Sequence, residues 1–270
     1  MSEALLQLRQ VGMRFSGLQA VDGLDFSVMA GQVVGLIGPN GAGKTTVFNL
    51  ITGVYRPTAG QVLWQGRDIT GAPPHQVAAL GIFRTFQTIR LFPGLSVLEN
   101  VQAGLHLQTR QRWWQGLLGT PAQRREESSQ RAQVRELLAR LNLADVADED
   151  ATSLAYGLQR RVELARALIA KPKLLILDEP AAGLNDQESL ELNRTILSIR
   201  DGGVTVLLVE HDMNVVMNVT DHIVCINFGR KSAAGTPAQI RNDPRVIEAY
   251  LGRDDDDDDD LEPAAAGAAA

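Results

Sequence analysis

The segment GPNGAGKTT, from Gly38 to Thr46, has the residue types and spacing of a phosphate-binding loop. Glycines let backbone N–H groups turn toward phosphate oxygens, and the start of the following helix adds the positive end of its dipole. In this pattern Lys44 reaches the β and γ phosphates and the Thr45 hydroxyl ligates Mg²⁺. The predicted phosphate-binding residues are Gly38, Pro39, Asn40, Gly41, Ala42, Gly43, Lys44, Thr45 and Thr46. The sequence therefore predicts binding of a nucleoside triphosphate with Mg²⁺.

A second candidate feature is LLILDEP, an apolar run that ends in the adjacent carboxylates Asp178 and Glu179. Neighbouring strand residues point to opposite sides, so the two acids are expected to do different work. We expect Asp178 to help hold Mg²⁺ and Glu179 to activate water for attack on the γ phosphate. A solvated acidic pair is the alternative, and a phosphate-binding loop earlier in the same sheet weighs against it. His211, in LLVEHD, also follows an apolar run, although a lone histidine is more often structural.

The elements that must position these residues alternate between strand and helix patterns. The runs KLLILDEP and VTVLLVEHD flank a helical segment, which implies a parallel sheet with right-handed crossovers. β-rich runs dominate the first part, and HIVCINFGRKSAAGTP resembles a hairpin. From about Leu91 to Leu143 the spacing turns helical, which predicts an inserted helical subdomain. Trp113 and Trp114 are expected to pack inside this insert.

Composition narrows the class of protein. The chain of 270 residues is 44% hydrophobic and has no apolar run of the roughly 18 residues that span a bilayer. Its net charge of −6 comes from the tail, where Asp254 to Asp260 and Glu262 carry eight negative charges and leave residues 1–253 at +2. A near-neutral body argues against nucleic-acid binding. The single cysteine, Cys225, is expected to be a buried strand thiol, and the tail at 253–270 is expected to be disordered.

Six motifs follow one another along the chain: the phosphate-binding loop, RTFQ, LAYG, LLILDEP, AAGLN and EHD. Their order is the one found in ATP-binding cassette transporter ATPases, which this chain resembles over about residues 5–252. The resemblance implies an α/β fold: a P-loop NTPase core with a parallel sheet, an N-terminal antiparallel β subdomain and an inserted α-helical subdomain at about 91–160. A soluble cassette ATPase, a regulatory cassette that binds ATP without hydrolysis and a P-loop kinase are the alternatives. Intact Lys44, Asp178, Glu179 and His211 disfavour the regulatory alternative.

The resemblance also implies roles for residues outside the first two motifs. Gln87 would sense Mg²⁺ and the attacking water, and His211 would orient the γ phosphate. Phe15 corresponds to the aromatic residue that stacks on adenine, although it could equally belong to a hairpin core. Asn185 stands in the D-loop, where the family more often has Asp. The signature segment would contact the nucleotide of the opposite subunit, and its residues are Leu154, Ala155, Tyr156, Gly157 and Leu158.

The signature departs from the usual family pattern at two positions. Ala155 lacks the common serine hydroxyl, a loss worth about 1.5 to 3 kcal/mol where that hydrogen bond exists. Leu158 stands where glutamine is usual, which puts polar contacts near the ribose in doubt. Gly157 still allows close backbone approach, and the helix that should follow contains no Gly or Pro before Leu168. We therefore interpret the segment as a nucleotide-sensing motif that depends on its backbone.

The phrases RTFQTIRLFPGLSVLENV and GTPAQIRNDPRVIEAYLG narrow the resemblance to the ATPase subunits of bacterial high-affinity branched-chain amino-acid importers. Such a subunit would hydrolyse ATP at the cytoplasmic face of the inner membrane, as a peripheral protein. Its implied partners are membrane permease subunits, a sister ATPase subunit in a heterodimer or a second copy in a homodimer, and, indirectly, a periplasmic amino-acid-binding protein. Importers of urea or other small amides are the nearest alternative, since the solute does not contact this chain.

Overall fold

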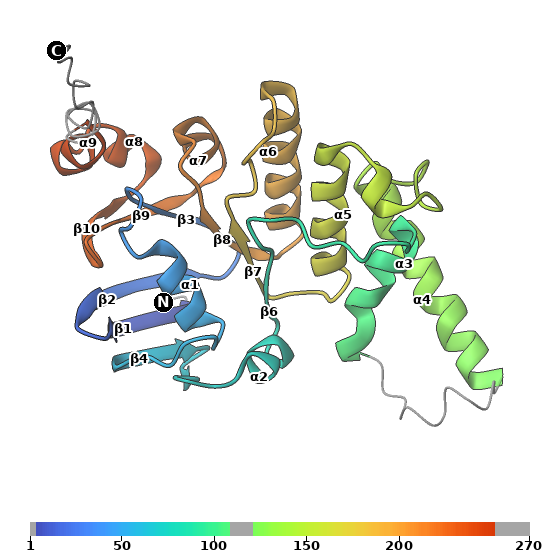
Figure 1. The fold of residues 1–270 in the computed structure, drawn as a ribbon, viewed down its shortest axis with the longest axis horizontal. Coiled ribbons are helices and arrows are strands. Elements are labelled where there is room, and N and C mark those ends of the chain that lie inside the picture. Colours follow the sequence, from blue (N-terminus) through green and yellow to red (C-terminus); the bar gives the residue numbers. More distant parts are fainter. Residues whose placement is uncertain (1–3, 109–120, 252–270) are drawn as a thin grey trace, which may run out of the picture.

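A parallel sheet, an antiparallel sheet and a group of helices build the part of the chain that the computed structural model describes, residues 4–108 and 121–251 (Figure 1). Within these ranges, none of the helices is both long and apolar enough to cross a membrane. The predictions for Trp113, Trp114 and the tail at 253–270 lie outside the described residues. The predicted division of the chain into a domain at 5–252 and a tail stays a prediction.

The larger sheet has six strands in the order β10-β9-β3-β8-β7-β6. Neighbouring strands from β9 to β6 run parallel, and β10 pairs antiparallel with β9. Its strands are β3 (Val33–Ile37), β6 (Ile82–Arg84), β7 (Leu174–Asp178), β8 (Thr205–Val209), β9 (His222–Asn227) and β10 (Arg230–Gly235). Every residue of β3, β7 and β8 is buried, as expected for parallel strands covered on both faces. The parallel arrangement predicted for the runs around Asp178 and His211 is confirmed.

The smaller sheet is antiparallel, with the strand order β2-β1-β4-β5. Its strands are β1 (Ala4–Phe15), β2 (Leu18–Met29), β4 (Ala59–Trp64) and β5 (Arg67–Asp68). Its buried side chains share one apolar core with helix α1 (Lys44–Ile51) and with one face of the parallel sheet. Figure 1 shows α1 between the two sheets. This core fixes α1, and therefore the loop in front of it, against both sheets.

Helices cover the other face of the parallel sheet. Figure 1 shows α6 (Asp186–Asp201) and α7 (Met213–Val219) on that side, opposite α1. Leu192 and Ile196 of α6 pack in a second core with the strand leucines that face them, Leu175, Leu177 and Leu208. The helices α8 (Pro237–Arg241) and α9 (Pro244–Leu251) lie on the same side as α7, over β9 and β10. Cys225 of β9 is 3% exposed in the core that β9 shares with α7 and α8, so the predicted buried strand thiol is confirmed.

A third set of helices forms its own core at one end of the molecule (Figure 1). These helices are α3 (Val97–Gln102), η1 (Ala103–Gln108), α4 (Pro121–Arg140), η3 (Ala151–Ser153) and α5 (Tyr156–Leu168). Ser96 begins α3 with a capping box, since its hydroxyl accepts from the Glu99 N–H while the Glu99 carboxylate accepts from the Ser96 N–H. The stretch between β6 and β7 is thus largely helical, in line with the inserted segment expected from its Leu- and Arg-rich spacing. The remaining short helix, α2 (Pro74–Ala79), precedes β6.

Candidate functional site

The predicted phosphate-binding loop lies between β3 and α1, at the carboxyl end of the parallel sheet. Two of its glycines are required by close backbone approaches. Gly38 has φ +155°, and a Cβ atom there would lie 2.1 Å from the carbonyl oxygen of Ile226. Gly43 has φ +102°, and its Cβ would lie 2.6 Å from the carbonyl oxygen of Ala20. Any side chain at either position would therefore push the loop away from β9 or β2.

Lys44 is the first residue of α1 and reaches back across the loop. Its ammonium Nζ donates to the carbonyl oxygens of Gly38 at 2.6 Å and Pro39 at 3.0 Å. The side chain is buried, and α1 has no acidic residue in its first turn. The helix dipole and the ammonium therefore place positive charge on the same side of the loop, which suits a phosphate group.

A pocket of about 450 Å³ opens beside this loop. Its lining residues are Phe15, Leu18, Gln19, Ala20, Asn40, Gly41, Ala42, Gly43, Lys44, Thr45, Thr46, Glu179 and Phe228. Phe15 ends β1 and meets Tyr55 edge-on, with ring centroids 5.2 Å apart. Phe228, which the sequence analysis missed, lies in the turn between β9 and β10 and is 85% exposed. The sequence feature that could have indicated Phe228 as a pocket residue is its position, as a large aromatic residue, in the turn of the expected hairpin.

Asp178 is the last residue of β7 and is paired with Arg84, the last residue of β6. The guanidinium Nη2 lies 2.6 Å from Oδ2 of Asp178, and Nη1 donates to Oδ1 of Asn49 at 2.7 Å. Both charged side chains are 9% exposed. Arg84 is a residue that sequence reasoning missed, although it belongs to the RTFQ motif. It supplies the positive charge that lets the Asp178 carboxylate stay buried.

Glu179, Gln87 and His211 converge next to Asp178. The amide Nε2 of Gln87 donates to Oε2 of Glu179 at 2.6 Å, and the Nδ1 atom of His211 lies 3.9 Å from that oxygen. Strand alternation was expected to separate Glu179 from Asp178, but the strand has ended there: Glu179 adopts φ +46°, while its N–H still donates to the carbonyl of Val209. This left-handed turn, costly for a residue with a Cβ, directs the carboxylate into the pocket beside the predicted phosphate-binding loop.

Glu210, beside His211, organises the loops at this edge of the sheet and was also missed from the sequence. Its buried carboxylate accepts from the backbone N–H of Ala181 at 2.7 Å and of His211 at 3.1 Å. Burial raises the pKa of the Glu210 carboxyl, while these hydrogen bonds act in the opposite direction. Glu210 therefore fixes the loop after Glu179 to the loop that carries His211. The one sequence feature that could have indicated this role of Glu210 is the presence of an acidic residue at the end of an apolar run, just before His211.

The predicted signature segment lies at the start of α5, away from the pocket beside the glycine-rich loop. None of its residues lines that pocket, whereas Glu179 and Thr45 do. Ala155 is the N-cap of α5 and makes no side-chain cap hydrogen bond. A Cβ atom on Gly157 would lie 2.5 Å from Oε1 of Glu188 in α6, so the glycine leaves room for the end of that side chain, which would have to move if a Cβ atom were present. The structure thus separates the predicted signature from the predicted phosphate-binding residues.

Two of the three departures from the family pattern, Leu158 and Asn185, have local structural explanations. Leu158 is partly buried against the core of the helical group, so an apolar side chain suits its position. Asn185 is the N-cap of α6 and forms a capping box with Glu188, whose N–H its side-chain oxygen accepts at 3.0 Å. Asparagine and aspartate cap helices about equally well, so this substitution leaves the start of α6 intact.

A glycine-rich loop, a lysine and a carboxylate around one pocket at the carboxyl end of a parallel sheet define a P-loop nucleotide-binding protein. The family described as "ABC transporter" matches residues 21–182, and the one described as "Branched-chain amino acid ATP-binding cassette transporter" matches residues 233–256. The chain belongs to the ATP-binding cassette transporter family, as its motifs predicted. Its fold is the α/β fold expected from them.

Several relatives match nearly the whole chain. The high-affinity branched-chain amino acid transport ATP-binding protein BraF of Pseudomonas aeruginosa is 48% identical over 93% of this chain and 99% of the relative. The corresponding protein LivG of Escherichia coli K12 is 46% identical with the same coverage. Among solved structures, the ADP conformation of MJ1267, an ATP-binding cassette of an ABC transporter, is 30% identical, with a TM-score of 0.80 over 92% of this chain and 99% of that one.

Proposed function

We propose that this chain is the ATP-binding and ATP-hydrolysing subunit that powers import of branched-chain amino acids through a membrane permease. The observation that carries ATP hydrolysis is the position of Glu179, whose carboxylate lines the same pocket as Lys44 and Thr45. The identity of the transported solute rests on the relatives BraF and LivG and on the family match at residues 233–256. These similarities favour a branched-chain amino-acid importer over a urea or amide importer.

The phosphate-binding loop and Lys44 bind the phosphate groups of ATP. The N–H groups at the start of α1 and the Lys44 ammonium receive the β and γ phosphates, while the carbonyls of Gly38 and Pro39 hold that ammonium in place beforehand. Phe15 and Phe228 line the other part of the pocket, where Phe15 stacks on the adenine ring. Asn40, Thr46 and the remaining loop residues complete the contact with the triphosphate.

Hydrolysis requires a base near the γ phosphate, and Glu179 occupies that place. Its carboxylate takes a proton from water as the water oxygen attacks phosphorus in line, and the bond to the ADP oxygen breaks to give ADP and phosphate. Gln87 holds the carboxylate through its 2.6 Å hydrogen bond and orients the water. His211, near Glu179, stabilises the γ phosphate as charge develops on its oxygens.

The residues present fit a Mg²⁺ ion that is completed by the substrate. Among the described residues no group of three or more His, Cys, Asp or Glu side chains could hold a metal by itself. Mg²⁺ prefers oxygen ligands, and three side chains offer them: the hydroxyl of Thr45, the amide oxygen of Gln87 and the carboxylate of Asp178. Mg²⁺ commonly takes its other ligands from phosphate and water. When bound, the ion neutralises charge on the β and γ phosphates.

The remote position of the signature supports a dimer as the active unit. Because Leu154 to Leu158 do not line this chain's pocket, a second cassette is needed to bring its own signature to the nucleotide. We infer a sister ATPase subunit in this place, with permease subunits and a periplasmic amino-acid-binding protein completing the importer. The chain would sit peripherally at the cytoplasmic face of the inner membrane.

The test of this function is ATP hydrolysis by the assembled importer. The chain is co-expressed with its permease and sister subunit, purified and placed in vesicles with the periplasmic binding protein. We expect leucine, isoleucine or valine to raise the ATPase rate and to accumulate on the far side of the vesicle membrane. Stimulation by urea or an amide instead would favour the alternative importer, and hydrolysis that no solute or permease affects would overturn the transport assignment.

A further inference from the structure

A buried ion pair joins helix α5 to the segment that carries Gln87. Arg160 and Glu163 lie one turn apart on α5, and their side chains are 1% and 2% exposed. The guanidinium Nη1 lies 2.9 Å from Oε2 of Glu163. Neither residue lines the nucleotide pocket, so neither contacts ATP. The pair begins only two positions after Leu158, the end of the signature segment.

The guanidinium of Arg160 spans two consecutive backbone carbonyls. Nη1 donates to the carbonyl oxygen of Phe86 and Nη2 to that of Gln87, both at 2.9 Å. A planar fork with several fixed N–H groups suits such a pair of acceptors, and the single ammonium of lysine would not reproduce it. The backbone of Gln87 is therefore tied to α5, while its side chain is tied to Glu179.

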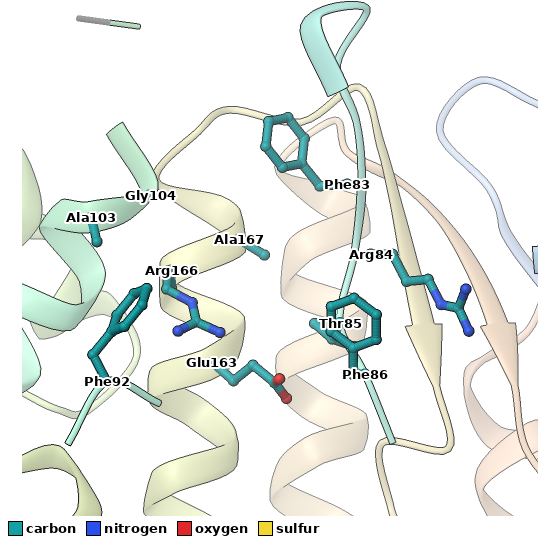
Figure 2. Close-up of a pocket in the computed structure, with 10 residues that line it drawn as sticks. All are labelled: Phe83, Arg84, Thr85, Phe86, Phe92, Ala103, Gly104, Glu163, Arg166 and Ala167. Carbon is teal, nitrogen blue, oxygen red and sulfur yellow. The ribbon is translucent and has the colours of Figure 1, made fainter. Parts of the chain in front are cut away.

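Glu163 holds Arg160 in this position from within the protein interior. Figure 2 shows Glu163 and Arg166 projecting from α5 toward the segment of Thr85 and Phe86, beside a pocket of about 260 Å³. Burial raises the pKa of the Glu163 carboxyl, and the charge of Arg160 opposes this shift. Glu163 thus supplies the negative charge that permits a guanidinium to be buried next to the Gln87 backbone.

Stability alone does not account for this pair. Nε of Arg160 has no hydrogen-bond partner among the described residues, so part of the cost of burying this guanidinium is not offset. An apolar pair of similar size would stabilise the interior about as well. The feature that an apolar pair would lack is the double contact with the carbonyls of Phe86 and Gln87.

We propose that Arg160, held by Glu163, is a positioning residue that fixes the backbone of Gln87 to α5, so that Gln87 moves together with the signature segment. A displacement of the signature, which begins the same helix, would then be transmitted through Arg160 to Gln87 and from its amide to Glu179. This proposal rests on the proposed function, because the role of Gln87 in hydrolysis belongs to that function.

The test is a double variant, Arg160→Met with Glu163→Leu, which removes the contact to the carbonyls and leaves neither member of the ion pair buried alone. We expect its affinity for ATP to stay within about twofold of the unchanged chain while kcat falls at least about tenfold. We also expect hydrogen exchange of the segment around Gln87 and Thr88 to become at least about tenfold faster, with exchange in the buried strand β8 unchanged.

Arg161→Gln is the matched control, because the neighbouring Arg161 pairs with Glu191 of α6 and not with Glu163. This variant should leave kcat and the exchange around Gln87 unchanged.

A double variant with unchanged kcat and unchanged exchange around Gln87 would overturn the proposal and leave the pair as an interchangeable part of the core. A loss of exchange protection throughout the chain would also overturn it, since the pair would then act on global stability. If the unchanged chain in its importer did not hydrolyse ATP, the proposed function would fail, whereas the exchange comparison would still decide whether Arg160 fixes Gln87.

Discussion

The Nη2 atom of Arg84 lies 2.6 Å from Oδ2 of Asp178, although the two residues are 94 positions apart in the sequence. The contact joins the ends of the neighbouring parallel strands β6 and β7. It also places the Arg84 guanidinium over the ring of Phe48 in α1, 5.4 Å from the ring centroid. Arg84 therefore connects the carboxylate expected to serve Mg²⁺ with the helix that follows the phosphate-binding loop.

Removing this arginine should destabilise the chain strongly. Because both side chains are 9% exposed, Arg84→Met would leave the Asp178 carboxylate buried without a cation. We expect the free energy of unfolding in urea to fall by about 3–5 kcal/mol. Arg200→Gln is the control: Arg200 pairs with the exposed carboxylates of Asp201 and Asp221, and its loss should cost less than about 1 kcal/mol. Equal losses for the two variants would show that burial does not set the contribution of the Arg84–Asp178 pair.

The carboxylate of Glu179 should be needed for turnover and not for binding. Glu179→Gln keeps the size of the side chain but removes its capacity to take a proton from water, so kcat should fall about a hundredfold or more. ATP affinity, measured with a fluorescent analogue, should be retained, and the variant should accumulate as an ATP-bound dimer. Glu136→Gln, on the exposed face of α4, provides the control with unchanged activity. Undiminished hydrolysis by Glu179→Gln would exclude Glu179 as the base.

The phosphate-binding loop could be predicted from sequence because its members are contiguous and its glycines are required locally. Lys44, Thr45 and the strand ending at Asp178 follow from short patterns and from the order of strands. The pairing of Arg84 with Asp178 and the hold of Arg160 on Gln87 could not be predicted in this way, since each joins segments brought together only by the folded sheet and helices. Short-range periodicity predicts elements, and it contains no information on which side chains meet across them.

Glu179 illustrates a different limit. Alternation along the strand holds for the residues before it, since Leu174 and Ile176 pack in one core and Leu175 and Leu177 in the core on the other face. The strand ends at Asp178, and the next residue adopts a positive φ that sequence patterns do not associate with glutamate. The expected separation of the two acids therefore arises from a backbone turn instead of from strand geometry.

The unusual Leu158 should matter less for hydrolysis than Lys44 does. Leu158 packs against the core of the helical group, so Leu158→Gln should lower the free energy of unfolding by about 1 kcal/mol while the ATPase rate stays within about threefold. Lys44→Ala removes the ammonium beside the phosphate-binding loop and should lower the rate about a hundredfold or more. If the unchanged chain were inactive and Leu158→Gln restored hydrolysis, a regulatory, non-hydrolysing cassette would be the better interpretation.

The thiol of Cys225 should report directly on unfolding, because burial raises its pKa from 9.0 to about 12. Since the folded-state pKa lies above that of the unfolded chain, the stability that this thiol contributes is fully present below pH 9 and is lost as the pH rises toward 12. At pH 8 the native chain should react with a thiol reagent at least about a thousandfold more slowly than the chain in denaturant. Labelling is followed by absorbance, and Cys225→Ala, which leaves the chain without cysteine, sets the background. Rapid labelling of the native chain would show that the β9 core opens without unfolding, in conflict with the 3% exposure of Cys225.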